Sequence, residues 1–288
     1  MSTYETAVDQ YVKVSGLNYA YRLFGNSSSS SPPLFLHIHF RGNMDYWDPA
    51  FINPLAEQRQ VLLIDNTGIG RSEGKVPTTY VQWARDIIGV VHALGIKQID
   101  SFGFSMGGFV SPLIALEAPD LVRKLVVAGA GPSHGEGVIG GDPQYFTEVA
   151  SGNTEEEARK AMINTFYSHH DKGKARGEEW WQRMTQARPN RQPLLQGEGL
   201  QAQIEAVQRW FGGEHREEGS YDRLGQIKIP TLVANGSNDL LVPTHNSYVL
   251  WSKLTSADAQ LHIYADSGHG FLDQYHDEFS RLLNEFLG

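Results

Sequence analysis

A serine at position 105 stands between two glycines, each two residues away, in the run Gly103-Phe104-Ser105-Met106-Gly107. Residues 99–104 are mostly apolar and residues 109–118 have helical character, so Ser105 is predicted at a sharp turn from a strand into a helix. Glycine is needed on both sides of such a turn because a side chain there would collide with its neighbours. The strained turn would hold the hydroxyl out at the edge of a sheet, where it could act as a nucleophile.

A serine hydroxyl is a weak nucleophile and needs a base, which a histidine could supply. His269 lies between two glycines in a short loop after a predicted strand, residues 260–264. Asp239 follows another predicted strand, residues 231–235. Taken alone, the histidine could be an exposed loop residue and the aspartate a turn former. Together with Ser105, however, they come from the carboxyl ends of three separate strands, where open α/β sheets bind ligands.

Strands and helices alternate along most of the chain, which is typical of a parallel sheet covered on both faces. The strands are nearly continuous apolar runs, as expected of strands buried on two sides. The predicted fold class is therefore α/β, with a doubly wound, mostly parallel sheet. The strands are expected at 11–14, 17–24, 34–40, 60–65, 99–104, 124–128, 231–235 and 260–264, and the helices between and after them at 48–58, 78–94, 109–118, 244–254 and 271–286.

The alternation stops between about residues 132 and 225, where no buried strand is evident. Helices are expected there at 154–167, 178–187 and 199–211. The predicted boundaries are a first part of the core at 1–131, a helical cap at 132–225 and a second part of the core at 226–288. Both junctions should lie at the carboxyl edge of the sheet, so the insertion is expected to cover Ser105 as a lid that excludes water.

These motifs resemble those of the α/β-hydrolase superfamily, and the resemblance covers nearly the whole chain. It rests on the glycine-flanked Ser105, on Gly236-Ser237-Asn238-Asp239 with Pro243, and on Ser267-Gly268-His269-Gly270. The stretch 65–72 is also similar to a loop of this family. In style, the chain resembles small lidded esterases, enol-lactonases and cofactor-free haloperoxidases.

The resemblance implies a role for each of the three residues. Ser105 would be the nucleophile, and His269 the general base and acid. Asp239 would orient the imidazole and stabilise its charged form. These roles imply an acyl-enzyme intermediate, which water then cleaves.

The resemblance also implies an oxyanion hole of two backbone N–H groups. One should belong to Met106, directly after the nucleophile. Comparison with related hydrolases places the other at Phe40, with Arg41 as the second choice, although the usual His-Gly pair is absent from this loop. The Phe40 side chain would then line the acyl pocket, unless it packs in the core.

Substrate contacts are expected from Arg41 and from one or two aromatic residues of the insertion. Trp181 and Trp210 are the candidates, because a lid over a serine needs an apolar underside. Most aromatic residues of the insertion should instead form the internal core of the helical layer.

The pair His37-Ile38-His39 could in principle bind zinc. Arg41 and Gly42 stand where further ligands would be needed, and the chain has no cysteine. Structural roles are therefore favoured for both histidines, and no metal or cofactor is expected.

Composition limits the partners and the compartment. The formal net charge is −9 without a basic run, which argues against a nucleic-acid partner. No apolar run could span a bilayer, and residues 1–10 lack a signal core, so a cytoplasmic protein without a membrane partner is expected. A small-molecule acyl substrate is the predicted partner, and the oligomeric state stays open.

The function predicted from these observations is a serine hydrolase acting on an ester, lactone or similar small acyl compound. Two alternatives use the same triad: hydrolysis of a C–C bond and cofactor-free perhydrolysis. A third is a small-molecule binding protein that kept the fold without turnover. Haloalkane dehalogenases and epoxide hydrolases are disfavoured, because they carry an aspartate where Ser105 stands.

Overall fold

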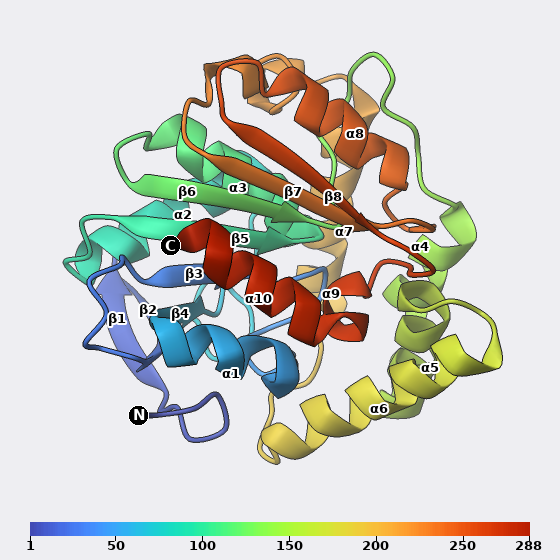
Figure 1. The fold of residues 1–288 in the computed structure, drawn as a ribbon, viewed down its shortest axis with the longest axis horizontal. Coiled ribbons are helices and arrows are strands. Elements are labelled where there is room, and N and C mark those ends of the chain that lie inside the picture. Colours follow the sequence, from blue (N-terminus) through green and yellow to red (C-terminus); the bar gives the residue numbers. More distant parts are fainter.

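A computed structural model describes residues 1–288 and is built around one eight-stranded sheet. The strand order is β1-β2-β4-β3-β5-β6-β7-β8, with the first two strands antiparallel to their neighbours and the rest parallel (Figure 1). This confirms the predicted mostly parallel sheet. The strands are β1 (Gln10–Val14), β2 (Leu17–Gly25), β3 (Leu34–His37), β4 (Gln60–Ile64), β5 (Ile99–Phe104), β6 (Val122–Ala128), β7 (Thr231–Gly236) and β8 (Ala259–Tyr264).

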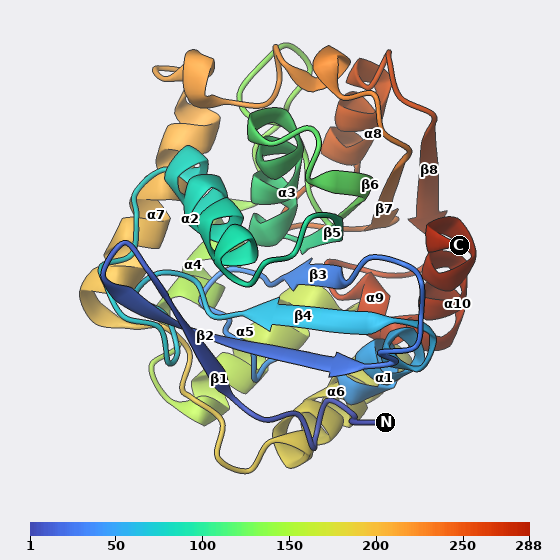
Figure 2. The ribbon, with the colours of Figure 1, turned by 90° about the vertical axis from the view of Figure 1, so that its left-hand side faces the viewer.

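Helices cover both faces of the sheet, as the apolar strands require. On one face lie α2 (Tyr80–Ala93), α3 (Met106–Glu117) and α8 (Thr244–Lys253). On the other lie α1 (Pro49–Gln58), α9 (Phe271–Gln274) and α10 (His276–Leu287) (Figure 2). The central strand β5 is buried along its whole length, so the strand that leads to Ser105 is held by packing on both sides.

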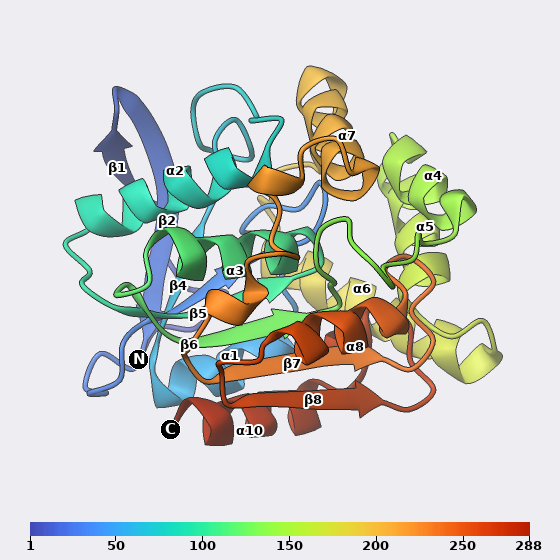
Figure 3. The same ribbon diagram turned by 90° about the horizontal axis from the view of Figure 1, so that it is seen from above.

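Between β6 and β7 the chain leaves the sheet and forms four helices. They are α4 (Pro143–Ser151), α5 (Glu155–Phe166), α6 (Asp171–Ala187) and α7 (Gly197–Gly212), followed by the short 3-10 helices η1 (Arg216–Glu218) and η2 (Leu224–Gln226). Seen from above, α4, α5 and α6 lie beyond the arrowheads of β6, β7 and β8 (Figure 3). The four helices α4 to α7 are here named the cap. Its members α4, α5 and α6 therefore lie at the carboxyl edge of the sheet.

Two features of the cap differ from the sequence prediction. Helix α4 was not predicted, although Asp142 caps its N-terminus and Pro143 occupies its first turn, both of which are helix-start signals. Helix α6 begins at Asp171 rather than at residue 178. Gly177 of α6 lies at a close contact with α5, because a Cβ on this residue would come within 2.9 Å of the Ile163 side chain.

The turn at Ser105 has the strained geometry that the glycines predict. Ser105 has φ 59° and ψ −119°, outside the regions that residues with a side chain normally occupy. A Cβ on Gly103 would lie 2.1 Å from the carbonyl oxygen of Gly107, and a Cβ on Gly107 would lie 2.1 Å from that of His37. The packing of α3 against β3 and β5 thus leaves no room for a side chain at either position.

None of the helices is long and apolar enough to cross a membrane.

The space around the turn leads to a stability prediction. Gly107→Ala should lower the free energy of unfolding by about 2 kcal/mol or more, because a backbone oxygen blocks the new methyl group. Gly212→Ala, in open space at the end of α7, should change it by less than about 1 kcal/mol. Urea unfolding of both variants measures this, and equal stability of the two would contradict the packing described for the turn.

Candidate active site

Three side chains form a hydrogen-bonded line at the carboxyl edge of the sheet. The Nε2 atom of His269 lies 2.8 Å from the hydroxyl oxygen of Ser105. The Nδ1 atom of the same ring lies 2.7 Å from an oxygen of Asp239. All three residues are buried, so the line is shielded from water. This is the arrangement in which an imidazole can take a proton from a serine while a carboxylate holds its tautomer.

Asp239 is positioned by the loop that follows β7. One carboxylate oxygen faces His269, and the other accepts hydrogen bonds from the backbone N–H groups of Leu241 and Val242. These donors hold the carboxylate in one orientation and compensate its negative charge in a buried place. The loop therefore presents one oxygen, in a defined position, to the histidine.

His269 is held by close contacts from the sheet and the cap. Its ring packs between Phe104 of β5 and Phe166 of α5, at centroid distances of 5.0 and 5.1 Å. The backbone N–H of Gly270 donates to the carbonyl oxygen of Phe166, and a Cβ on Gly268 would lie 2.8 Å from that oxygen. The glycines flanking the histidine are thus required because the end of α5 rests on this loop.

A small apolar cavity of about 50 Å³ opens at the serine hydroxyl. Apart from Ser105, every residue lining it is apolar, and no charged group faces it. The lining residues are Phe40, Met106, Phe109, Phe146, Val149, Val207, Phe211, Leu241 and Val242. The cavity therefore suits an uncharged apolar group next to the nucleophile.

Phe40 and Met106, predicted as oxyanion donors, both line this cavity. Neither of their backbone N–H groups donates a hydrogen bond within the protein. Met106 is the first residue of α3, where the helix leaves its N–H groups unpaired and favours negative charge. The Phe40 ring packs on Phe146 of α4, at a centroid distance of 5.3 Å, so it belongs both to the pocket wall and to the contact with the cap.

Arg41, Trp181 and Trp210, predicted to contact the substrate, do not line the cavity at Ser105. Arg41 and Trp181 instead border a separate, open cleft of about 280 Å³ between the cap and the core. The backbone N–H of Arg41 is also excluded as the second oxyanion donor, because it already binds the side-chain oxygen of Gln203 at 2.8 Å.

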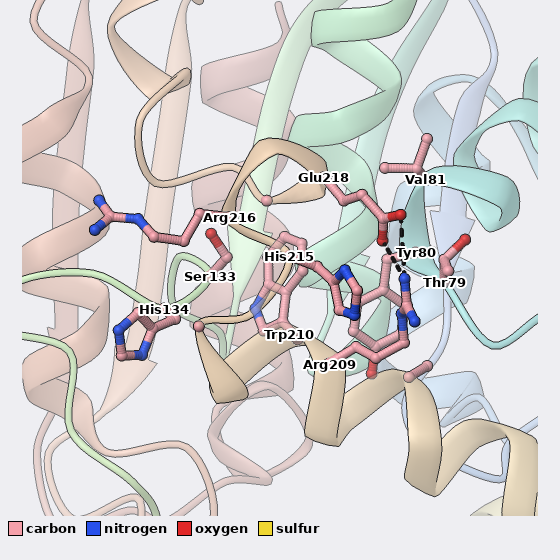
Figure 4. Close-up of a pocket in the computed structure, with 13 residues that line it drawn as sticks. Thr79, Tyr80, Val81, Ser133, His134, Arg209, Trp210, His215, Arg216 and Glu218 are labelled. Carbon is pink, nitrogen blue, oxygen red and sulfur yellow. Dashed lines mark hydrogen bonds and ion pairs between the residues drawn. The ribbon is translucent and has the colours of Figure 1, made fainter.

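Trp210 lines another, much smaller pocket at the C-terminal end of α7 (Figure 4). Its ring also packs on the rings of Tyr80 and Phe109, at centroid distances of 5.3 and 5.6 Å. The ion pair between Arg209 and Glu218 borders the same pocket. With about 20 Å³, the pocket has room for one water molecule rather than for a ligand.

The cavity residues that sequence reasoning missed come from three places. Leu241 and Val242 lie two and three residues after Asp239, and Phe109 lies one helical turn after Ser105, so their nearness to the triad was a usable signal. Phe146 and Val149 come from the helix α4 that was not predicted. Val207 and Phe211 lie on α7. Which face of this helix is turned toward the serine depends on how the cap packs.

The two histidines of the H-x-H pair are buried, and neither belongs to a cluster with metal-ligand spacing. The His37 ring stacks on Trp83, and burial lowers its pKa to about 3. Burial also lowers the pKa of His39 to about 4, while its Nδ1 donates to the carbonyl oxygen of Phe40. The one cluster with metal-ligand spacing is His215, Glu217 and Glu218, on the surface near η1, and exposed acidic groups of this kind are common without a metal.

Comparisons with known proteins agree on the architecture. A model of the family described as alpha/beta hydrolase fold matches residues 32–274. An alpha/beta hydrolase fold protein from Chitinophaga pinensis superposes with a TM-score of 0.85 at 29% identity, over 99% of each chain. A 2-hydroxymuconate semialdehyde hydrolase of Pseudomonas sp. strain CF600 is 27% identical, over 91% of this chain and 88% of that protein. A 2-hydroxy-6-oxo-6-phenylhexa-2,4-dienoate hydrolase of Comamonas testosteroni is 29% identical, over 79% and 77% of the two chains.

The buried His37 leads to a prediction on stability and pH. The pKa of His37 is lower in the folded protein than in the unfolded chain. The unfolded chain therefore binds a proton at this ring near pH 6.5, and the folded protein does not. Wild-type stability should therefore fall as the pH drops below 6.5, by up to about 1.4 kcal/mol per unit from this group. The unfolding free energy of His37→Leu, minus that of the wild type, should rise by about 1–3 kcal/mol between pH 6.5 and 4.5.

Urea unfolding at several pH values measures this difference, and His245→Leu, at an exposed position of α8, is the matched control. A difference for His37→Leu that stays constant with pH would show that the ring is charged or hydrated in the folded protein.

Proposed function

The chain belongs to the alpha/beta hydrolase fold family, and from this premise we propose that it is a serine hydrolase that cleaves an ester, lactone or similar small acyl compound. The observation that carries the proposal is the buried line from Ser105 through His269 to Asp239. Its two short hydrogen bonds join the nucleophile, the base and the orienting acid in the order that acyl transfer requires.

The proposed reaction has two halves. In the first, Nε2 of His269 takes the proton of Ser105 while the serine oxygen attacks the carbonyl carbon of the substrate. The negative oxygen that forms would be stabilised by the N–H groups of Phe40 and Met106. The intermediate collapses to an acyl-enzyme, and the leaving group takes the proton from His269. In the second half, water replaces the leaving group and repeats these steps to release the acid.

The cavity supports a short, uncharged acyl group. No cation faces it, so a carboxylate on the acyl group would be buried without a partner, which is costly. A cavity of about 150 Å³ holds benzene, so about 50 Å³ suits a group much smaller than benzene, such as a short acyl chain. Longer chains would require the cap to move.

The second candidate is C–C bond hydrolysis by the same triad. It is favoured by two relatives whose names are those of a dienoate hydrolase and a semialdehyde hydrolase. In the named dienoate the carboxylate lies on the leaving group and not on the acyl group, so the apolar lining of the cavity does not decide between the two candidates. Perhydrolysis and ligand binding without turnover are the remaining alternatives, and the experiment below separates hydrolysis from binding.

The test is a panel of p-nitrophenyl esters with the wild type and Ser105→Ala. The wild type should hydrolyse the acetate and butyrate esters with a kcat/KM about tenfold or more above the octanoate ester and the negatively charged monosuccinate ester. Ser105→Ala should lose a factor of about 10⁴ or more in kcat while keeping its unfolding midpoint.

Near wild-type esterase activity in Ser105→Ala would show that Ser105 is not the nucleophile. A wild type that cleaves 2-hydroxy-6-oxo-6-phenylhexa-2,4-dienoate faster than every ester would favour the second candidate. Tight binding of the esters without turnover would favour a binding protein.

A further inference from the structure

Arg41 connects the loop of the oxyanion hole to the cap. Its guanidinium is buried, and its hydrogen bonds go to backbone carbonyl oxygens and not to a carboxylate. It donates to three backbone carbonyl oxygens of the insertion: that of Leu195 at 2.9 Å, and those of Val149 and Gly152 at 2.7 Å. Val149 and Gly152 lie at the C-terminal end of α4, where the helix dipole favours a cation.

The backbone of Arg41 is held by the insertion as well. Its N–H donates to the side-chain oxygen of Gln203 in α7, and its carbonyl oxygen accepts from the N–H of Leu195 at 3.0 Å. The peptide group between Phe40 and Arg41 is fixed at its other end too, because His39 donates to the carbonyl oxygen of Phe40. Arg41, which follows the proposed oxyanion donor, thus has hydrogen bonds at its backbone N–H, its carbonyl oxygen and its side chain.

The conformation of Arg41 makes these contacts necessary. Its φ is 65°, in the left-handed region that residues other than glycine rarely adopt. Such a conformation persists only where the surroundings impose it. Here most of the surrounding contacts come from the insertion, at α4, α7 and Leu195, rather than from the core that carries the loop.

We propose that Arg41 is a positioning residue, through which the cap sets the oxyanion hole: with α4 and α7 seated, it holds the loop so that the Phe40 N–H faces the substrate. Arg41 does not itself touch the substrate, because it does not line the cavity at Ser105. The catalytic part of this proposal rests on the proposed serine-hydrolase function. The structural part, coupling of the loop to the cap, stands by itself.

A second arginine offers a matched control. Arg188, directly after α6, also donates to three backbone carbonyl oxygens, those of Tyr4, Glu5 and Ala7. It too ties the insertion to the core, through the N-terminal segment and through ion pairs with Asp9 at 3.6 Å and Asp45 at 3.8 Å, but none of these bonds reaches Phe40 or Arg41. Loss of either arginine should weaken the seating of the cap, and only loss of Arg41 should disturb the oxyanion hole.

The experiment compares Arg41→Met with Arg188→Met by kinetics on the best ester of the panel. For Arg41→Met, kcat should fall by about 10- to 100-fold with KM changed less than about threefold, because displacing one donor weakens the transition state and not the bound ester. A trifluoromethyl ketone with the same acyl group forms a tetrahedral adduct with the serine, and its inhibition constant should rise by a similar factor. Arg188→Met should keep kcat and the inhibition constant within about threefold.

A readout without turnover accompanies the kinetics. Hydrogen exchange of the backbone amides of residues 39–42 should be about tenfold faster or more in Arg41→Met than in Arg188→Met. If Arg41→Met does not fold, Gln203→Leu removes only the acceptor of the Arg41 N–H. In that variant, kcat should fall about threefold to tenfold and exchange in the same loop should increase.

Unchanged exchange in the loop, or equal effects of the two arginine variants on kcat and on inhibition by the ketone, would overturn the proposal. An inactive wild type would overturn the proposed function instead, and the exchange measurement would still decide whether Arg41 couples the loop to the cap.

Discussion

The strained turn at Ser105 is the constraint on which the rest of the structure depends. A residue with a side chain at φ 59° and ψ −119° stays there only because β5 is buried along its whole length and α3 packs directly against β3 and β5. That packing is close enough to exclude any side chain at Gly103 and Gly107. The strain is held by the core of the sheet, and it leaves the hydroxyl pointing out of the carboxyl edge, where the loops after β7 and β8 bring the aspartate and the histidine.

The cap contributes to the site as well as covering it. The end of α5 supports the histidine loop, through the Phe166 ring beside His269 and the hydrogen bond from Gly270. Helices α4 and α7 hold the loop of Phe40 through Arg41 and supply four of the ten residues that line the cavity. Two of the loops that carry the chemistry are therefore shaped by residues of the insertion, which gives a physical reason why movement of the cap would affect the chemical step and not only entry of the substrate.

The parts of the site that the sequence predicts are those enforced by local geometry. Glycines around Ser105 and His269 mark places where the chain is too crowded for a side chain, and the strand ends place Ser105, Asp239 and His269 on one edge. The substrate contacts could not be obtained in this way, because they depend on which face each cap helix turns toward the serine. Tryptophans 181 and 210 had the expected chemistry but pack elsewhere, whereas Val207 and Phe211 line the cavity. Arg41 was singled out for its position next to Phe40, yet its partners are carbonyl oxygens more than a hundred residues away.

The central claim is that Ser105 is the nucleophile of a hydrolase whose base is already in place. Reaction with a small alkyl fluorophosphonate, followed by intact mass and peptide mapping, tests it most directly, because the reagent marks only an activated serine. We expect one adduct per chain on the peptide that contains Ser105, and no adduct in His269→Ala under the same conditions. Labelling at another residue, or equally fast labelling of His269→Ala, would contradict it.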